Sequence, residues 1–262
     1  MSPQILESWS RSMRAASLSE ETIKLRRAHI RRALSEIGKP LSEITAADLI
    51  EFLAGHEWSP ATRRSYRSSL VAFVKHAASL GEIDSRAADL PPARVPRSLP
   101  RPAADSAIDI ALKVAPPRVQ LMIELMSLGG LRRGEVARVR AEDLSGEWLT
   151  VVGKGGHTRV VPLPGHVCHR VRQHTGFLFP GAIDGHLSAR RVGELVRDAL
   201  PTGVKPHQLR HRYATTVYRH SGDIRAVQTL LGHAKLDTTA IYVQVANQDQ
   251  RHAAETAWKL AG

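Results

Sequence analysis

Cysteine is scarce in this sequence, and long apolar segments are absent from it. The single cysteine, Cys168, excludes an internal disulfide bond and a cysteine-rich zinc site. Cys168 lies between His166 and His169 and could be a metal ligand, but we favour a small buried residue within a helix. No apolar run reaches about 18 residues, and the first thirty residues contain no apolar stretch of the signal-peptide kind. We therefore expect neither export nor a membrane span, and a protein that works in the cytoplasm.

Acidic residues are also few. The chain has 25 of them against 37 Lys and Arg residues, which gives a formal net charge of +12, and the basic residues are spread along the whole chain. Hydrophobic residues make up 42%, which is typical of a globular protein. A folded basic protein often binds nucleic acid, because each neutralised phosphate releases counterions. A solvated basic surface and an anionic membrane remain open as alternatives at this point.

Short polar side chains that can cap helices divide the first ninety residues into helical segments. Serine and threonine accept hydrogen bonds from the backbone N–H groups of a first turn, and glycine readily ends a helix. The predicted helices run from Ser19 to Gly38, from Thr45 to Gly55 and from Ser59 to Gly81. The predicted buried stripe of the last helix is Tyr66, Leu70, Phe73, Ala77 and Leu80.

Basic side chains gather on the first and last of these helices. On the first they follow one flank, and on the last they crowd the opening turns. Charged residues on a helix usually form its solvated side, but two separate clusters favour a surface that faces DNA phosphates. Which of them would read bases stays open. The candidate DNA contacts are Lys24, Arg27, Arg31, Arg63, Arg64 and Arg67.

Residues 91–102 contain five prolines and three arginines. Proline has a fixed φ and no N–H donor, so the segment is predicted to be a stiff, extended connector. We therefore predict a helical domain over residues 1–90, a linker over residues 91–104 and a second domain over residues 105–262. A basic linker between two basic domains suits a clamp that closes around a duplex.

The second domain combines helices with one β-hairpin. Two helical stretches precede Gly129-Gly130, and a short helix begins near Arg132. Runs of β-branched residues at 148–152 and 158–163 flank the glycine-rich segment 153–157, which is typical of a hairpin. The predicted fold class is therefore mainly α with a small antiparallel β-sheet (α+β). Further helices are predicted at 165–174, 188–200, 206–220, 223–231 and 248–260, and Asp237 is predicted to cap a helix that carries Tyr242.

Several separated positions carry side chains that could act on a phosphate. Arg132 follows a glycine turn, where the start of a helix can present it to an anion. Lys154 lies among three glycines at the hairpin tip. His207 and Arg210 are three residues apart on a helix, so they share a face and could grip one phosphate. Taken singly, each also fits an ordinary surface turn or a solvated charge.

His233 ends the sequence Leu-Leu-Gly-His, and Tyr242 follows nine residues later. A tyrosine on a helix is more often a core residue than a nucleophile. His207 and His233 could instead suggest a metal site. Carboxylate and thiolate ligands are lacking nearby, however, and Arg210 would repel a cation, so we predict no metal.

The combination has a chemical logic that the single positions lack. Breaking a phosphodiester without a metal requires a nucleophile, cations for the charge of the transition state and an acid for the leaving 5′-oxygen. Tyr242 could be the nucleophile, the arginines and histidine the cations, and Lys154 the acid. The basic surface would hold the substrate.

In this combination the sequence resembles the tyrosine recombinase (phage integrase) family, which includes the Xer and Cre proteins. The resemblance is strong over the C-terminal two-thirds and looser over the N-terminal helices. Tyr213 stands in the second box of the family pattern, where an aromatic residue usually packs in the core. In chain order, the matching residues are Arg132, Glu135, Lys154, His207, Arg210, His233 and Tyr242.

The resemblance implies a mechanism without metal, ATP or other cofactor. Tyr242 would attack a phosphate and form a 3′-phosphotyrosyl link, and Lys154 would protonate the leaving 5′-oxygen. Arg132, Arg210 and His233 would stabilise the non-bridging oxygens, His207 would move or position a proton, and Glu135 would hold the site together.

The resemblance also implies partners. These are double-stranded DNA recombination sites and a homotetramer that exchanges strands through a Holliday junction. Residues 1–90 would be the core-binding domain, and we expect no arm-binding domain before it. The helix at 248–260 would dock on a neighbouring protomer or on its own domain. An accessory factor could set the direction of recombination.

Integration and excision of a phage or prophage genome is the role we favour over a chromosomal Xer-like or transposon role. Two further classes stay open. One is a DNA-binding regulator without catalytic activity, although binding alone needs neither Tyr242 nor Lys154. The other is a type IB-like topoisomerase, which uses similar chemistry but relaxes DNA without exchanging strands.

Overall fold

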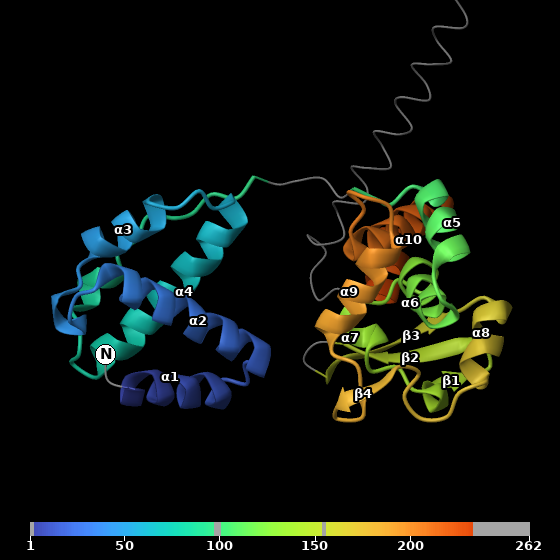
Figure 1. Cartoon of the computed structure of the whole chain (residues 1–262), viewed down its shortest axis with the longest axis horizontal. Coiled ribbons are helices and arrows are strands. Elements are labelled where there is room, and N and C mark those ends of the chain that lie inside the picture. The colour runs from blue at the N-terminus through green and yellow to red at the C-terminus, as the bar shows by residue number, and fades with distance from the viewer. Residues whose placement is uncertain (1–2, 97–100, 154–155, 233–262) are drawn as a thin grey trace, which may run out of the picture. The chain divides into compact units, whose positions relative to one another are not determined.

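A computed structural model describes residues 3–96, 101–153 and 156–232 (Figure 1). The chain divides into two compact units, with the division between residues 97 and 98. Each unit has its own hydrophobic core. None of the described helices is both long enough and apolar enough to span a bilayer.

The first unit is helical, and α2 packs against α1, α3 and α4. The predicted helix starts are confirmed: Ser19 and Ser59 each accept a hydrogen bond from the backbone N–H three residues on, and Thr45 forms a capping box with Asp48. Gly38 adopts the left-handed conformation at the end of α2, with φ 67°. The elements are α1 (Pro3–Ala15), α2 (Glu20–Ile37), η1 (Leu41–Glu43), α3 (Ala46–Ala54), α4 (Pro60–Ser79) and η2 (Ser85–Ala88).

Aromatic and aliphatic side chains of α4 form the centre of this unit's core. Phe73 is 1% exposed and packs edge-on against Trp9 of α1, with ring centroids 5.3 Å apart. The predicted stripe is confirmed over four of its five members, but Leu80 is 50% exposed. Leu80 departs from the stripe because α4 ends at Ser79, so its side chain no longer follows the helical period.

The second unit adds a small sheet to a set of helices, as predicted. A three-stranded antiparallel sheet has the order β1-β2-β3, and the β2–β3 hairpin pairs Leu149 with Val161 and Val151 with Arg159. The short strands β1 and β4 were not predicted. The elements are α5 (Asp105–Val114), α6 (Pro117–Ser127), α7 (Arg133–Val136), η3 (Ala141–Asp143), β1 (Leu144–Ser145), β2 (Trp148–Val152), β3 (Thr158–Pro162), α8 (Gly165–Arg172), β4 (Pro180–Ile183), α9 (Ala189–Ala199), α10 (Pro206–Ser221) and α11 (Ile224–Leu231).

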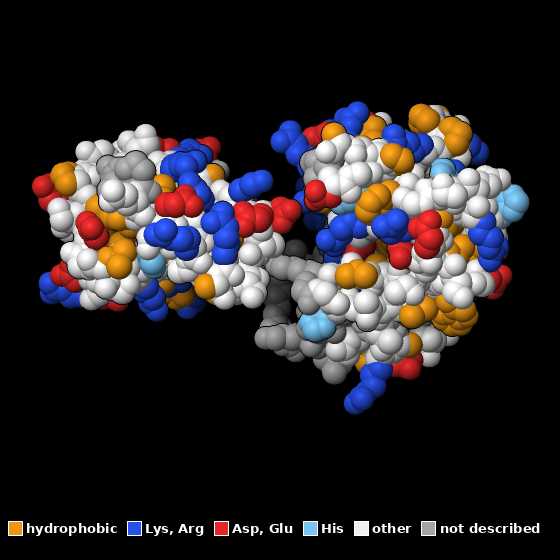
Figure 2. Space-filling model, turned by 90° about the horizontal axis from the view of Figure 1, so that it is seen from below, with side chains coloured by type: hydrophobic (Ala, Val, Ile, Leu, Met, Phe, Trp, Pro, Cys, Tyr) orange, Lys and Arg blue, Asp and Glu red, His pale blue; other side chains and the backbone are white. Residues whose placement is uncertain are grey.

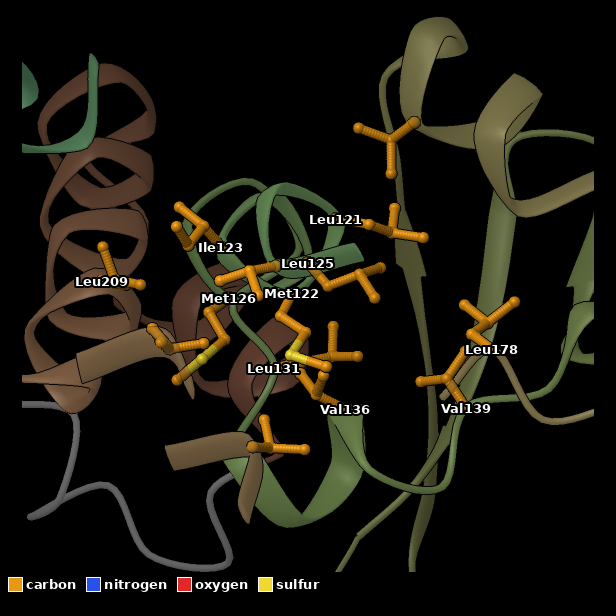
Figure 3. Close-up of a cluster of buried hydrophobic side chains, with 14 of the residues drawn as sticks. Leu121, Met122, Ile123, Leu125, Met126, Leu131, Val136, Val139, Leu178 and Leu209 are labelled. Carbon is orange, nitrogen blue, oxygen red and sulfur yellow. The ribbon is translucent and has the colours of Figure 1, made fainter. Parts of the chain in front are cut away.

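Helix α6 lies at the centre of the second core, and all its residues from Leu121 to Ser127 are buried, Glu124 among them. It packs against α5, α7, α8, α9 and α10. In Figure 3 its side chains lie between Leu209 of α10 and the segments that carry Val139 and Leu178. Cys168 of α8 is fully buried, which confirms its interpretation as a small core residue. The labelled core residues of Figure 3 are Leu121, Met122, Ile123, Leu125, Met126, Leu131, Val136, Val139, Leu178 and Leu209.

Candidate active site

The glycine turn between α6 and α7 places Arg132 at the start of α7. Gly130 adopts a φ of +66°, and a Cβ built there would lie 2.4 Å from the ring of Tyr213. Tyr213 is 8% exposed and packs in the core, as predicted. Only glycine fits this position, because both the backbone conformation and the aromatic ring exclude a side chain. Packing against Tyr213 therefore fixes the conformation of the turn, and this fixes the backbone position of Arg132.

Glu135, the third residue of α7, is the centre of a cluster of guanidinium groups. Its carboxylate accepts hydrogen bonds from Nη1 and Nη2 of Arg159, at 3.0 and 2.7 Å, and from Nη1 of Arg132 at 2.7 Å. It also accepts the backbone N–H of Arg132 at 2.8 Å, and Nη1 of Arg210 lies 3.7 Å away. The carboxylate side chain is 2% exposed. A buried carboxylate with three arginines around it is fully compensated in charge and in hydrogen bonds.

The ionisation of Glu135 is fixed by these neighbours. Burial alone would raise its pKa, but the hydrogen bonds from Arg159 and Arg132 outweigh burial and lower the pKa of Glu135 to about 2. The group is therefore an anion across the physiological range. It acts as a fixed negative charge that aligns cations, and not as a proton donor.

Arg210 of α10 connects three parts of the site. Its side chain is 1% exposed, and it donates to the carbonyl of Gly130 at 2.5 Å and to the carbonyl of Leu231 at 2.6 Å. Gly130 belongs to the turn before Arg132, and Leu231 is the last residue of α11. Arg210 thus ties the glycine turn to the carboxyl end of α11.

Sequence reasoning missed Arg159 on β3. Its side chain is 7% exposed, it pairs with Glu135, and its Nε donates to the carbonyl of Leu230 at 2.8 Å. A signal for it was present in the alternation of the strand, because Arg159 and Val161 occupy the buried positions of β3. An arginine on the inward face of a strand requires a buried partner.

His207 lies in the first turn of α10 and is exposed. Its ring lies 4.2 Å from that of His211, centroid to centroid. The protein atoms packed around the ring, followed by the positive charges of Arg210 and Arg132, lower the pKa of His207. Burial lowers the pKa of His211 further, to about 4. His207 and His211 are therefore neutral at pH 7, so the cationic charge of this cluster comes from its arginines.

Three predicted catalytic residues lie outside the described part of the chain: Lys154, His233 and Tyr242. The predicted helix at 248–260 lies outside it as well. Their immediate neighbours are described. Gly153 donates its N–H to the carbonyl of His157 at 2.8 Å, and Gly232 ends α11 with a φ of +62°. Within the described residues, the fold brings Arg132, Glu135 and Arg210 together, with His207 beside them.

The predicted DNA contacts of the first unit differ in their surroundings. Arg63 donates to the carbonyls of Leu53 and His56, both at 3.0 Å, and so caps the end of α3. Arg67 donates to the carbonyls of Leu90 and Pro91, both at 2.6 Å. Arg27 pairs with Glu7, whereas Lys24, Arg31 and Arg64 are exposed. For all six residues, contact with DNA stays a prediction.

On the face of each unit drawn in Figure 2, Lys and Arg side chains are scattered among acidic side chains. No single-sign patch marks a DNA-binding surface on these faces. Among the described residues, no group of three or more His, Cys, Asp or Glu side chains could hold a metal ion.

The chain thus has a helical first unit and a second unit in which Glu135 contacts arginines from the start of α7, from β3 and from α10. The family model described as "Phage integrase family" matches residues 103–249. The model described as "Phage integrase, N-terminal SAM-like domain" matches residues 5–80. The chain belongs to the phage integrase family.

Curated relatives match over nearly the whole chain. Tyrosine recombinase XerA of Thermococcus kodakarensis is 31% identical over 273 residues, covering 97% of this chain and 95% of the relative. Tyrosine recombinase XerD of Caulobacter vibrioides is 30% identical, covering 92% and 94%. The family and these relatives show a tyrosine recombinase, an enzyme of DNA strand exchange.

Solved structures share the fold. The integrase from mycobacterium phage Brujita is 29% identical, covers 94% of this chain and 90% of its own, and has a TM-score of 0.50. A lambda integrase (75–356) dimer bound to a COC′ core site has a TM-score of 0.72 at 20% identity, covering 91% and 94%. The second likeness is one of fold alone.

Proposed function

We propose that this recombinase cleaves and rejoins DNA at specific sites through a 3′-phosphotyrosyl intermediate on Tyr242. The observation that supports this most is the cluster of Arg132, Glu135 and Arg210, in which α10 brings the buried Arg210 to the start of α7. Such a cluster concentrates positive charge and keeps its geometry before the substrate arrives, as stabilisation of a phosphoryl transition state requires. Relatives about 30% identical over nearly the whole chain are named tyrosine recombinases.

In the proposed reaction, the hydroxyl oxygen of Tyr242 attacks the phosphorus and the bond to the 5′-oxygen breaks. Arg132 and Arg210, with His233, would balance the charge on the non-bridging oxygens. Lys154 would give its proton to the leaving 5′-oxygen. Attack of that 5′-hydroxyl on the phosphotyrosine reverses the step, so the energy of the phosphodiester bond is conserved and ATP is not consumed.

His207 and Glu135 would support this chemistry in different ways. Because the pKa of His207 is lowered, its neutral ring can accept or donate a hydrogen bond at pH 7 and would position or move a proton. Glu135 is an anion and would hold Arg132 and Arg210 in the orientation that meets the phosphate. It would not transfer a proton itself.

The proposed partners are double-stranded DNA sites and further copies of the chain. The first unit, with Lys24, Arg27, Arg31, Arg63, Arg64 and Arg67, would contribute a basic DNA-binding surface. A structural neighbour is a lambda integrase tetramer bound to a Holliday junction, at 19% identity and a TM-score of 0.69. We propose the same stoichiometry here, with residues 248–260 docking on a neighbour and an accessory factor setting direction.

For the biological role we propose integration and excision of a phage or prophage genome. The likeness to the phage Brujita integrase, at 29% identity, supports this role. The curated Xer relatives, at 30–31% identity, favour a chromosomal role as the second candidate. Reaction products separate the two. A reaction that both joins two separate DNA molecules and resolves directly repeated sites supports integration and excision, whereas one confined to directly repeated sites on one plasmid supports a chromosomal role.

The same assay tests the proposed activity. Purified protein would be incubated with a supercoiled plasmid that carries two copies of the DNA flanking its gene, and the products separated by size and topology. Exchanged DNA supports a recombinase. Relaxed but unexchanged DNA would indicate a topoisomerase, and bound but unaltered DNA a regulator.

A further inference from the structure

Arg159 lies in surroundings that seldom accept a charge. It occupies an inward position of β3, with Val161 next on the same face and Val151 opposite on β2. A guanidinium so buried is costly unless every polar contact is good. The contacts of Arg159 meet that condition through two different partners.

The first partner is Glu135, which Arg159 meets with a two-pronged contact of 2.7 and 3.0 Å. This is the strongest geometry that an arginine and a carboxylate can form. The same carboxylate orients Arg132, at 2.7 Å, and faces Arg210 at 3.7 Å. A displacement of Glu135 would therefore move the cations of the site.

The second partner is the carboxyl end of α11. Nε of Arg159 donates to the carbonyl of Leu230 at 2.8 Å. Gly232 passes so close that a Cβ there would lie 3.0 Å from Cδ of Arg159. In the sequence, the next residue is His233. Arg159 thus fixes the point from which the chain continues into the segment of His233 and Tyr242.

Arg159 also lies next to the point at which the hairpin turn begins. A Cβ on Gly153 would lie 3.6 Å from Oε1 of Glu135 and 3.8 Å from Nη1 of Arg159. In the sequence, Lys154 follows Gly153 directly. One buried side chain therefore touches the approach to Lys154, the carboxylate that aligns Arg132, and the approach to His233.

We propose that Arg159 is a positioning residue of the recombinase site, which aligns Glu135 and joins the hairpin to the end of α11. This inference rests on the proposed function. Lysine cannot replace the arginine, because a single ammonium group lacks the planar fork that serves Glu135 and the Leu230 carbonyl together. The charge of Arg159 keeps Glu135 ionised, and its shape keeps the site aligned, so two variants can separate these contributions.

The experiment compares Arg159→Lys and Arg159→Met with wild type on a nicked recombination site that traps the covalent adduct. DNA affinity and the first-order cleavage rate at saturating protein would be measured from pH 4 to pH 8. Arg159→Lys is expected to bind DNA within about threefold of wild type and to cleave about 100-fold more slowly, because misplacement by about 1 Å can cost this much. The acid limb of its pH–rate profile, which is the pH range over which cleavage slows on acidification, should stay near that of wild type.

Arg159→Met is expected to lose at least as much rate, and the acid limb of its profile should move to higher pH. Without the cation, Glu135 becomes protonated at a higher pH and releases its arginines. A residue that only stabilised the fold would lower the melting temperature without moving this limb. The pH profile therefore distinguishes positioning from bulk stability.

Arg170 provides a matched control in the same unit. It also pairs with a buried carboxylate, that of Glu124, and it also donates to a backbone carbonyl, that of Pro117. Arg170→Lys and Arg170→Met should lower the melting temperature comparably, yet cleave within about threefold of wild type at an unchanged acid limb.

Cleavage by Arg159→Lys at the wild-type rate would overturn the proposal. An equal loss in the Arg170 variants, or an unmoved acid limb in Arg159→Met, would overturn it as well. A wild-type protein that forms no Tyr242-dependent adduct would overturn the proposed function itself. That failure is visible before any Arg159 variant is compared.

Discussion

Glu135 shows how a buried charge can be stable and useful at the same position. Its removal from water is offset by hydrogen bonds from two arginines and a backbone N–H. The resulting pKa of about 2 lies well below the ordinary value of 4.5. Because that difference exists only in the folded chain, Glu135 links stability to pH.

The first prediction concerns this linkage. A carboxyl group with a depressed pKa stabilises the fold above its unfolded pKa, and this stability is lost as the pH falls from 4.5 towards about 2. The contribution is on the order of 3 kcal/mol at neutral pH. Urea unfolding of wild type and Glu135→Gln between pH 2.5 and pH 7 measures it. The variant should be less stable at pH 7 and lose less on acidification; parallel curves would contradict this.

The second prediction concerns His211. Burial holds its folded pKa at about 4, below the ordinary 6.5, so protonation favours the unfolded chain. Stability present above pH 6.5 should therefore decline as the pH falls towards 4. His211→Phe keeps a ring but cannot titrate. Its unfolding free energy should change less than that of wild type between pH 7 and pH 4, because one titrating group has been removed. An equal change in both proteins would show that His211 is not responsible.

At the scale of elements, the glycine turn before α7 depends on one residue without a side chain. Gly130→Ala would meet both a strained φ of +66° and the ring of Tyr213 at 2.4 Å. Gly146 has a similar φ of +58°, but a Cβ added there would meet nothing within 4 Å. The two glycines therefore separate backbone strain from steric overlap.

The third prediction compares these substitutions. Gly146→Ala should cost about 1–2 kcal/mol, which is the strain of a left-handed alanine. Gly130→Ala should cost about 1–3 kcal/mol more, because overlap with a packed ring forces neighbouring groups to shift. Chemical denaturation of both variants measures the difference. Equal costs would mean that Tyr213 moves aside freely.

Neighbouring arginines of α4 provide the fourth prediction. Arg63 caps α3, so Arg63→Met should lower the unfolding free energy of the first unit by about 1–2 kcal/mol. Arg64 is exposed, so Arg64→Met should leave stability within about 0.5 kcal/mol. If Arg64 contacts a phosphate, its loss should reduce the slope of log affinity against log salt by about 1. Unfolding and salt-dependent binding test both variants, and an unchanged slope for Arg64→Met would remove it from the DNA surface.

Local features of these elements could be predicted from sequence because their causes are local. The caps at Ser19, Thr45 and Ser59 act within a few residues, and the hairpin follows from alternation around a glycine-rich turn. Leu80 was wrongly assigned to the buried stripe because helical periodicity alone does not show where a helix ends. Strand β1 is two residues long, too short for any pattern.

Long-range contacts were less accessible. Glu135, Arg132 and Arg210 could be named from a motif, but their distances depend on packing across 75 or more residues between α7 and α10. Arg159 escaped because its role depends on a partner 24 residues away and a carbonyl 71 residues away. Alternation marks Arg159 as buried, but only the fold shows what it meets.

At the scale of the whole molecule, two units with separate cores suit a division of labour. The helical unit carries exposed basic side chains, and the second unit carries the arginine cluster. Family membership covers both units, since separate matches span residues 5–80 and 103–249. We propose that a basic surface of the helical unit holds DNA and that Tyr242 cuts it.

Covalent trapping tests that claim most directly. Wild type and Tyr242→Phe would be mixed with nicked DNA sites from the region flanking the gene, in buffer with a metal chelator, and quenched in detergent. The account predicts a protein–DNA adduct with wild type, and none with Tyr242→Phe although that variant still binds. An adduct that persists in Tyr242→Phe, or wild-type binding without any adduct on these sites, would contradict it.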